Sequence, residues 1–441
     1  MDTANLRIIS DLKKFLMEIH THTDLWSRSV ISDKAFTRKR NLPFSTLVLM
    51  ILNLPKRSLS IELHSFFSHI NRAGCGKSAF SMQRSKLKAF FFQLWNEVLI
   101  RGFYQYYGSR VKRWKGFIML AFDDSTISLP NTTELGKIYG YTSNGAGRYG
   151  VAACGCVMYD ALNKLILDSK LLPYQTSERS VVMEQLKHAP SDSLLTFDRG
   201  YPCFWLFYLL LQKTDCKFIM RASKNFNQVV KTFLQSPEQD QTATFHPSSK
   251  SIKQMKQFGL TITQETFVNL RIVKIPLKSG ETEILITNLD DSQIYSLQDL
   301  KEAYFLRWKV ETCFSTLKNQ LQIEIFSGIR QLCVEQDFFA NLFVHNLQSI
   351  IEKQCEDSVA KVNQKRMHNY QINKNISLGI PKNRIVDMFL EDNPQEVMLE
   401  LQALFRLYLE PVRPNRTYPR IQKTIQESGK HKTFTNYKRA I

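Results

Sequence analysis

Four side chains that can bind ions share one stripe of a predicted helix. Read as a single helix over 304–318, the sequence places Tyr304, Glu311 and Lys318 two turns apart on one face, with Arg307 beside them. Glu311 can ligate a cation, whereas Arg307 and Lys318 can bind anionic oxygens, the first as a planar fork and the second as a point charge. This stripe favours a site that holds a metal ion against phosphate groups. The alternative is an ordinary solvated helix of mixed charge.

Two aspartates stand at the ends of predicted strands, where a charged carboxylate directly after an apolar run indicates a functional role. Asp123 follows the apolar run 117–122, and Asp198 follows the apolar run 193–197. With Glu311 they offer three carboxylates, which suit two hard divalent ions, Mg²⁺ or Mn²⁺. Two such ions can activate an attacking water or 3′-hydroxyl and stabilise the leaving oxygen of an in-line phosphoryl transfer. The chain shows no competing serine or cysteine nucleophile elbow.

The elements around these acids predict an α/β fold. Predicted strands at 150–159, 164–172 and 217–220 alternate with predicted helices at 178–188 and 202–212. In a sheet built this way the site lies at the carboxyl ends of the strands, where Asp123 and Asp198 stand.

Three regions divide the chain. Residues 1–114 read as a helical N-terminal domain, and 115–333 as the catalytic domain, with a mostly β insertion at about 225–298. Residues 334–441 return to helix and end in a basic tail. From Pro411 onward this tail sets eight Lys and Arg side chains against one acid, Glu427, so it is predicted to be loosely ordered and able to lie along DNA.

The N-terminal region contains a candidate DNA-binding helix. The segment 78–95 has apolar residues at helical spacing, and Arg84 and Lys86 lie near its start. A helix that contacts DNA is the sharper interpretation, and a small basic helical domain with a solvated charged face is the alternative.

The composition of the chain indicates which kinds of partner it can bind. Among 441 residues, 59 Lys and Arg outnumber 40 Asp and Glu, which gives a formal net charge of +19. This excess favours a polyanionic partner, nucleic acid before a membrane surface, although a merely basic protein remains the alternative. The most apolar run, 203–211, is far shorter than the ~20 residues that a membrane span needs. The eight cysteines lack paired CxxC spacing, and no secretory signal is visible, so a cytoplasmic protein with reduced thiols is expected.

Taken together, three blocks of sequence resemble the catalytic blocks of DDE transposases of the bacterial insertion-sequence-4 family. The hallmark of that family is the Y-R-E-K spacing of the third block. The resemblance covers about 117–347. The blocks are Asp123-Asp-Ser-Thr-Ile-Ser-Leu-Pro130, Asp198-Arg-Gly-Tyr201 and Tyr304-x2-Arg307-x3-Glu311-x6-Lys318, accompanied by Thr287-Asn288-Leu289 and Phe326-Ser327-Gly328. Pro43-Phe44 and Ser78-Ala-Phe80 also look like the DNA-binding region of the family.

The resemblance implies a ribonuclease H-like core in which Asp123, Asp198 and Glu311 ligate the metal ions. Asp123 takes the first position because the family's aspartate stands four residues before the apolar position of Ile127, and Asp124 is the alternative ligand. The resemblance further implies that Tyr304, Arg307 and Lys318 contact the phosphates of the transposon ends.

The activity implied is that of a bacterial insertion-sequence transposase. It would bind terminal inverted repeats, cut the ends with Mg²⁺ and join them to target DNA as a homodimer assembled on DNA. Two alternatives stay open from the sequence. One is a non-catalytic DNA-binding protein derived from a transposase, and the other is a nuclease of the same fold that does not join strands.

Overall fold

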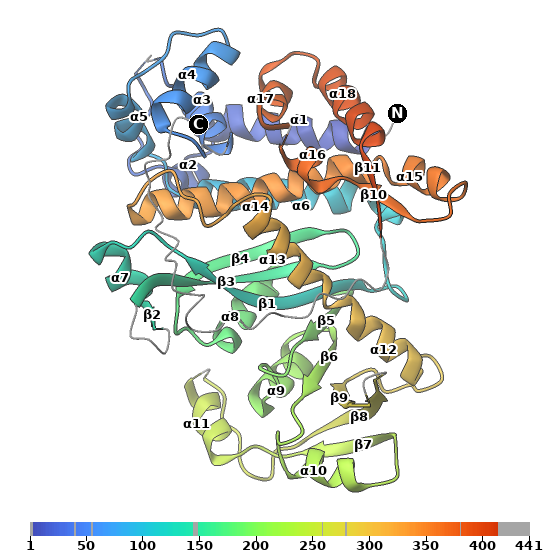
Figure 1. Ribbon diagram of the computed structural model, residues 1–441. Coiled ribbons are helices and arrows are strands. Elements are labelled where there is room, and N and C mark those ends of the chain that lie inside the picture. The colour runs from blue at the N-terminus through green and yellow to red at the C-terminus, as the bar shows by residue number, and fades with distance from the viewer. Residues whose placement is uncertain are drawn as a thin grey trace.

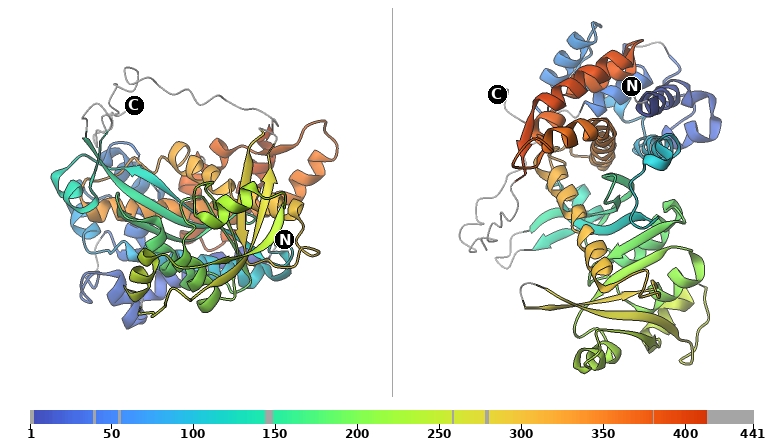
Figure 2. Two further views of the ribbon diagram at one scale, coloured as in Figure 1. Left: turned by 90° about the horizontal axis from the view of Figure 1, so that it is seen from below. Right: turned by 90° about the vertical axis from the view of Figure 1, so that its right-hand side faces the viewer.

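A layer of helices lies above a large mixed sheet, and helix α13 (Lys309–Asn319) crosses in front of the sheet (Figure 1). The computed structural model describes residues 3–38, 41–53, 56–143, 149–257, 259–277, 280–379 and 381–412. Seen from the side, the molecule is elongated, with the helical layer at one end and the last strands of the sheet toward the other (Figure 2). This mixed architecture confirms the α/β part of the predicted fold class.

Helices from both ends of the chain build the helical layer. Its N-terminal members are α1 (Thr3–Glu18), α2 (Thr23–Ser29), α3 (Phe44–Leu52), α4 (Leu59–His69), α5 (Lys77–Arg84) and α6 (Phe90–Tyr107), with the 3₁₀ turns η1 (Ile19–Thr21) and η2 (Gly108–Arg110). Its C-terminal members are α14 (Gln331–Lys353), α15 (Glu356–Asn363), α16 (Lys374–Gly379), α17 (Pro381–Leu390) and α18 (Pro394–Leu407). A small ladder pairs β10 (Tyr370–Ile372) with β11 (Leu409–Pro411) beside them.

The two sets of helices share one apolar core. Trp95 of α6 stacks on Phe343 of α14 with ring centroids 4.2 Å apart, and its indole N–H donates to the carbonyl of Leu12. Asn5 of α1 donates to the carbonyl of Ile350 at 2.7 Å. The N-terminal and C-terminal helices therefore pack as one layer, although they are more than two hundred residues apart in the sequence.

The described strands of the sheet run in the order β2-β3-β1-β5-β6-β9-β8-β7, with β4 also paired to β3. Only β1, β5 and β6 are mutually parallel; the other pairs are antiparallel. The strands are β1 (Ile118–Ser128), β2 (Tyr141–Ser143), β3 (Tyr149–Asp160), β4 (Leu165–Pro173), β5 (Ser193–Phe197), β6 (Lys217–Ala222), β7 (Asp240–Phe245), β8 (Val268–Pro276) and β9 (Thr282–Thr287).

Most of the remaining helices connect strands of the sheet, and the last two, α12 (Leu297–Leu306) and α13, lead from β9 to α14. These helices are α7 (Thr133–Tyr139), α8 (Glu178–Gln185) with η3 (Leu186–His188), α9 (Phe204–Lys213), α10 (Gln228–Gln235), α11 (Ser249–Gln257), α12 and α13. No helix in the described ranges is long and apolar enough to cross a membrane.

The structure adds two features to the predicted insertion at 225–298. It contains the helices α10 and α11 as well as the strands β7, β8 and β9. Its strands are also not a separate unit, because β9 pairs with β6 and continues the main sheet. Short-range alternation identified β8 and β9, but it carries no information about which strand becomes their neighbour.

The prediction of a single helix over 304–318 is wrong, because the structure divides this segment between α12 and α13. At the break, Arg307 and Trp308 donate their backbone N–H groups to residues three positions earlier, Tyr304 and Phe305, at 3.1 and 3.2 Å. The backbone stays in the right-handed helical region (φ −53 and −58). The tighter turn therefore retains the stripe of side chains while it interrupts the regular helix.

The shared helical core makes a testable prediction. Trp95→Ala removes a fully buried indole between α6 and α14 and should lower the free energy of unfolding by about 3–5 kcal/mol. Urea denaturation followed by circular dichroism measures this loss. Met367→Ala, at a side chain 94% exposed, is the control and should change stability by less than about 0.5 kcal/mol. Equal midpoints for the two variants would contradict a shared core.

Candidate active site

The structure brings Asp123 and Asp198 side by side. Asp198 directly follows β5, as predicted, whereas Asp123 lies in the middle of β1 and not at its end, because β1 continues to Ser128 as a partner of β3. The two strands are parallel, with Ala121 opposite Thr196, so the same register places Asp123 beside Asp198. Glu311 belongs to the first turn of α13, the helix that packs across β1. The three acids predicted from the sequence therefore come from three separate elements at one edge of the parallel strands.

Arg307 lies between these acids. Its side chain is only 1% exposed, and its Nη1 is 4.0 Å from Oδ2 of Asp123. Its Nη2 donates to Oε1 of Glu311 at 3.3 Å. Within the described residues, its Nε and Nη1 are buried and have no hydrogen-bond partner. A buried guanidinium with so few hydrogen bonds is stable only where negative charge surrounds it, and the carboxylates supply that charge.

Asp198 is held by two further side chains. The hydroxyl of Tyr304 donates to Oδ1 of Asp198 at 3.4 Å, and Tyr304 is buried. Nη1 of Arg221 is 4.0 Å from the same oxygen, and Nε of Arg221 is 3.3 Å from Glu283. Arg221 is not among the site residues predicted from the sequence. A cation inside the apolar strand 217–222 was the available signal, because such a residue is rarely buried without an acidic partner.

The charges of this cluster act on one another. Burial raises the pKa of Asp123 to about 7; Arg307 opposes this rise, while Asp124 and Glu311 add to it. For Arg307, burial lowers the pKa, but Tyr304 and the three acids outweigh it, so the net shift is upward. The guanidinium therefore stays charged, while Asp123 readily accepts a proton.

Asp124 lies on the other side of β1. It accepts a hydrogen bond from Sγ of Cys154 at 3.3 Å. Burial raises the pKa of Glu178 to about 7, and the charge of Asp124 adds to this rise. Successive side chains of a strand point to opposite faces, so Asp123 and Asp124 cannot both face Arg307. The geometry groups Asp123, and not Asp124, with Arg307 and Glu311.

Lys318 ties α13 to the far end of β1. Its Nζ donates to the carbonyl of Thr126 at 2.7 Å and lies 4.0 Å from Glu324. Glu324 in turn accepts from the backbone N–H of Ser128 at 2.9 Å. The side chain of Lys318 is 29% exposed, so it combines this structural contact with access to solvent.

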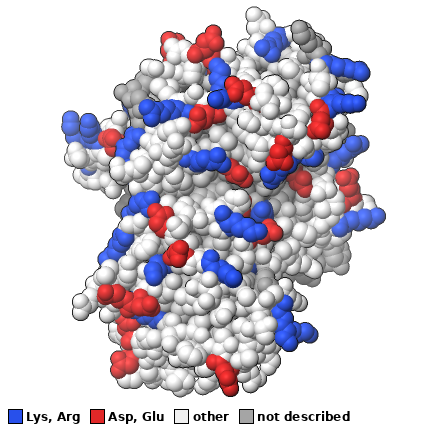
Figure 3. All heavy atoms as spheres, turned by 180° about the vertical axis from the view of Figure 1, so that it is seen from behind, with Lys and Arg blue, Asp and Glu red and all other residues white. Residues whose placement is uncertain are grey.

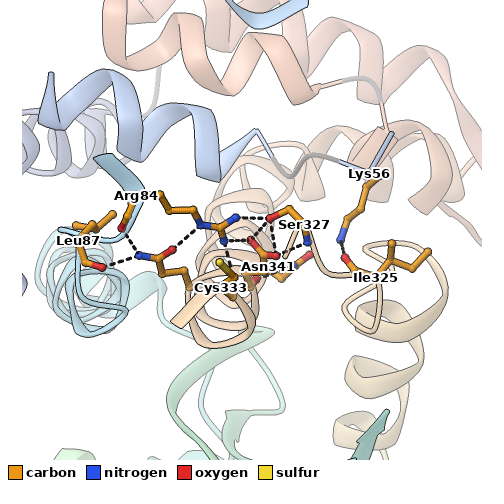
Figure 4. Close-up of polar contacts among 9 residues, drawn as sticks. Lys56, Arg84, Leu87, Ile325, Ser327, Cys333 and Asn341 are labelled. Atoms are coloured by element: carbon orange, nitrogen blue, oxygen red, sulfur yellow. Dashed lines mark hydrogen bonds and ion pairs between the residues drawn. The ribbon is translucent and has the colours of Figure 1, made fainter. Parts of the chain in front are cut away.

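Arg84 occupies a different place from the one predicted. Its guanidinium is buried and binds Asp337 at 2.7 Å, Gln336 and Ser327 at 2.6 Å, and the carbonyl of Cys333 at 3.1 Å (Figure 4). The prediction that Arg84 contacts DNA is therefore corrected: all three of its nitrogens bind residues of 327–337, which comprise the loop before α14 and the first turns of α14. The structure also divides the predicted helical segment 78–95 into α5 and α6, so Arg84 is the last residue of α5. In sequence, a buried cation at the end of a helix resembles a surface cation.

Lys86 and the basic tail stand apart from this cluster. Lys86 is half-buried and donates to Oε1 of Gln83 at 2.9 Å. The predicted basic tail lies outside the described residues from position 413 onward. On the face opposite to that of Figure 1, Lys and Arg are interspersed with Asp and Glu (Figure 3). The excess of positive charge is thus not gathered on that face.

The donor set fits a hard divalent cation in its chemistry. All three acids offer carboxylate oxygens, the ligands that Mg²⁺ and Mn²⁺ prefer. The side chains of Asp198 and Glu311 are 35% and 40% exposed, so a cation could reach them from solvent. Among the described residues, however, no three His, Cys, Asp or Glu side chains are grouped closely enough to hold a metal ion. In this arrangement Arg307 supplies the positive charge.

The raised pKa of Asp123 makes stability depend on pH. The carboxyl titrates near 7 in the folded protein and near its ordinary value of 3.8 in the unfolded chain, so the folded state binds more protons between these values. Stability therefore falls as pH rises through this window. In metal-free protein, Asp123→Asn should stabilise more at pH 8 than at pH 5, by roughly 2–3 kcal/mol. Urea denaturation at both pH values measures this, and a gain independent of pH would contradict it.

Comparison with known proteins places this site in a family. Residues 114–347 match the family model described as a transposase DDE domain. No curated protein matches the chain.

Among solved structures, one that is similar is a cryo-EM structure of piggyBac transposase in a synaptic complex with hairpin DNA. The TM-score is 0.41 at 11% identity, over 96% of this chain and 86% of that one, a likeness too distant to support an argument. The family match alone covers more than half of the chain and includes all three acids. The chain therefore belongs to the transposase DDE domain family.

Proposed function

We propose that this protein is an insertion-sequence transposase of the insertion-sequence-4 family with the Y-R-E-K signature. It binds the terminal inverted repeats of its element, cleaves the ends and joins them to target DNA. The observation that carries the proposal is the gathering of Asp123, Asp198 and Glu311, from three elements, around the buried Arg307. The parallel β1, β5 and β6 with antiparallel β3 also support a ribonuclease H-like core.

In this proposal Asp123, Asp198 and Glu311 hold two divalent ions, Mg²⁺ or Mn²⁺. When bound, such ions activate the attacking oxygen and stabilise the leaving oxygen of a phosphoryl transfer. The protein's own residues prepare the site. Arg307 keeps the acids together, because without a cation three neighbouring carboxylates repel one another. Tyr304 orients Asp198 through its hydroxyl.

DNA binding is proposed from the remaining signature residues. Lys318 is partly exposed beside β1 and can reach a backbone phosphate, and Lys86 offers a second cation in the N-terminal region. Tyr304 and Arg307 are buried, so their part in end binding is to shape the site. Phosphate contacts of this kind fix register, and base contacts give specificity.

The domain division and the assembly are also proposals. We retain 1–114 as the DNA-binding region, 115–333 as the catalytic domain and 334–441 as a helical region with a basic tail. A homodimer on DNA would hold two transposon ends together during cleavage and joining.

The test compares wild type with Glu311→Gln on DNA that carries the element's own ends, with Mg²⁺ present. The variant removes one anionic ligand without changing the side-chain size. It should bind ends with nearly unchanged affinity and lose cleavage and joining by roughly three orders of magnitude or more. Gel assays of cleaved and joined products measure this loss.

Glu302→Gln, at an exposed position of α12, is the matched control and should retain both activities. Cleavage by Glu311→Gln at the wild-type rate would refute the assignment of the site. Wild-type cleavage without joined products would favour a nuclease, and end binding without cleavage would favour a non-catalytic DNA-binding protein.

A further inference from the structure

A pocket apart from the acidic site is lined by four lysines. It has a volume of about 420 Å³ and lies between the turn that joins β3 to β4, the C-terminal half of α14, α15 and β10. We call it the four-lysine pocket, after Lys112, Lys164, Lys353 and Lys374. Its volume lies within the range of sites that bind small molecules, about 300–1,000 Å³.

Three of the lysines share two carboxylates. Lys112 donates to Glu356 at 2.9 Å, and Lys353 lies 3.9 Å from the same side chain. Lys374 binds Glu352 at 2.6 Å, and Glu352 is also occupied by two further donors, Ser377 and Gln348. One more acid, Asp357, lines the pocket from an exposed position of α15. The carboxylates of Glu352 and Glu356 are thus already paired with three of the four lysines.

Lys164 is the fourth lysine and has no ion pair within 4.0 Å among the described residues. Lys164 is an exposed residue, yet partial loss of hydration lowers its pKa, and Lys374 and Lys112 lower it further against the opposing effect of Glu352 and Glu356. Its ammonium group therefore stands in an environment where positive charge exceeds what the nearby acids neutralise. An added anion would relieve this repulsion.

The backbone of Lys164 is unusual. Its φ is +60°, in the left-handed region that glycine and asparagine favour over a lysine. The turn itself is set by Asp160, which accepts from the backbone N–H groups of Leu162 and Asn163 and, through its carbonyl, from that of Lys164. Glycine would satisfy the turn with less strain. A lysine at this position therefore needs a reason that the turn does not provide.

We propose that the four-lysine pocket binds a phosphate group and that Lys164 supplies the unshared cation for it. Lysine ammonium groups bind phosphate as point charges, and several converging on one anion suit a group with more than one negative charge. The side-chain amide of Asn163 is fixed by its bonds to the Lys112 backbone and to Asp160, which keeps the pocket wall in place.

The phosphate could come from the DNA backbone or from a free phosphorylated molecule. Asp160 pairs with Leu120, three residues before Asp123 on β1, and the turn with Lys164 follows. At about 3.3 Å per residue, the pocket is offset from the acidic site by on the order of 10–20 Å. A duplex covers that distance in roughly three to six base pairs. The DNA source rests on the proposed function, whereas the free source does not.

The first experiment titrates the full chain with inorganic pyrophosphate, without divalent metal, by isothermal calorimetry. Wild type should bind, and Lys164→Gly should bind at least about ten-fold more weakly while its melting temperature stays equal or rises, because glycine accepts the left-handed backbone. Lys361→Ala removes the same charge from an exposed position of α15 outside the pocket and should bind like wild type. No binding by wild type, or equal binding by Lys164→Gly, would overturn the proposal.

The second experiment identifies the source. Fluorescence anisotropy measures the affinity of wild type and Lys164→Gly for DNA that carries the element's ends, with and without saturating pyrophosphate. If the site holds a backbone phosphate, pyrophosphate weakens DNA binding several-fold in wild type but not in Lys164→Gly. If pyrophosphate binds yet leaves DNA affinity unchanged, the site takes a free phosphorylated molecule. Neither result depends on cleavage, so a failure of the proposed catalytic function is seen separately.

Discussion

The need to balance the charge of one buried guanidinium, that of Arg307, organises the centre of this protein. Arg307 is 1% exposed, and two of its nitrogens have no hydrogen-bond partner within the described residues. Such a cation can be buried only where carboxylates surround it, and these carboxylates in turn cannot stand close together without a cation. Asp123, Asp198 and Glu311 therefore constrain where β1, β5 and α13 can lie. Burial raises the pKa of Asp123 although this cation is beside it, and the neighbouring carboxylates Asp124 and Glu311 add to the rise.

The elements that carry this cluster are fixed at several points. A capping box formed by Ser296 and Asp299 begins α12, and Lys115, from the turn before β1, pairs with Asp299 at 2.9 Å. After α13, Lys56 of the helical layer donates to the carbonyl of Gln322 and to that of Ile325, the second of which Figure 4 shows. The loop then meets the Arg84 network at the start of α14. The turn before β1 thus holds the start of the segment that places Arg307 and Glu311, and the helical layer holds its end, so the packing of the helical layer and the geometry of the site are linked.

The sequence predicts the parts of the structure that depend on short-range pattern. The apolar run before Asp123 and the one before Asp198 predicted two strands and the acids next to them, because a continuous apolar run is typical of a strand that is buried on both faces. The break at Arg307 could not be predicted, since no glycine or proline marks it. The pairing of β9 with β6, and of α6 with α14, joins segments whose contact depends on tertiary packing alone. The types and spacing of residues identified the candidate site, whereas the residues that surround the site could be identified only from the folded structure.

Positive charge illustrates the same limit. Arg84, Arg271 and Arg307 look like DNA-facing cations in a chain of net charge +19, yet each is buried and bound to acids. Arginine suits such positions, because its planar fork satisfies a carboxylate with several hydrogen bonds. The cations left for a polyanion are those with solvent access and an incomplete set of acidic partners, of which Lys164 is the clearest described example. The net charge therefore indicates a polyanionic partner, but only burial and pairing show which cations are free to meet it.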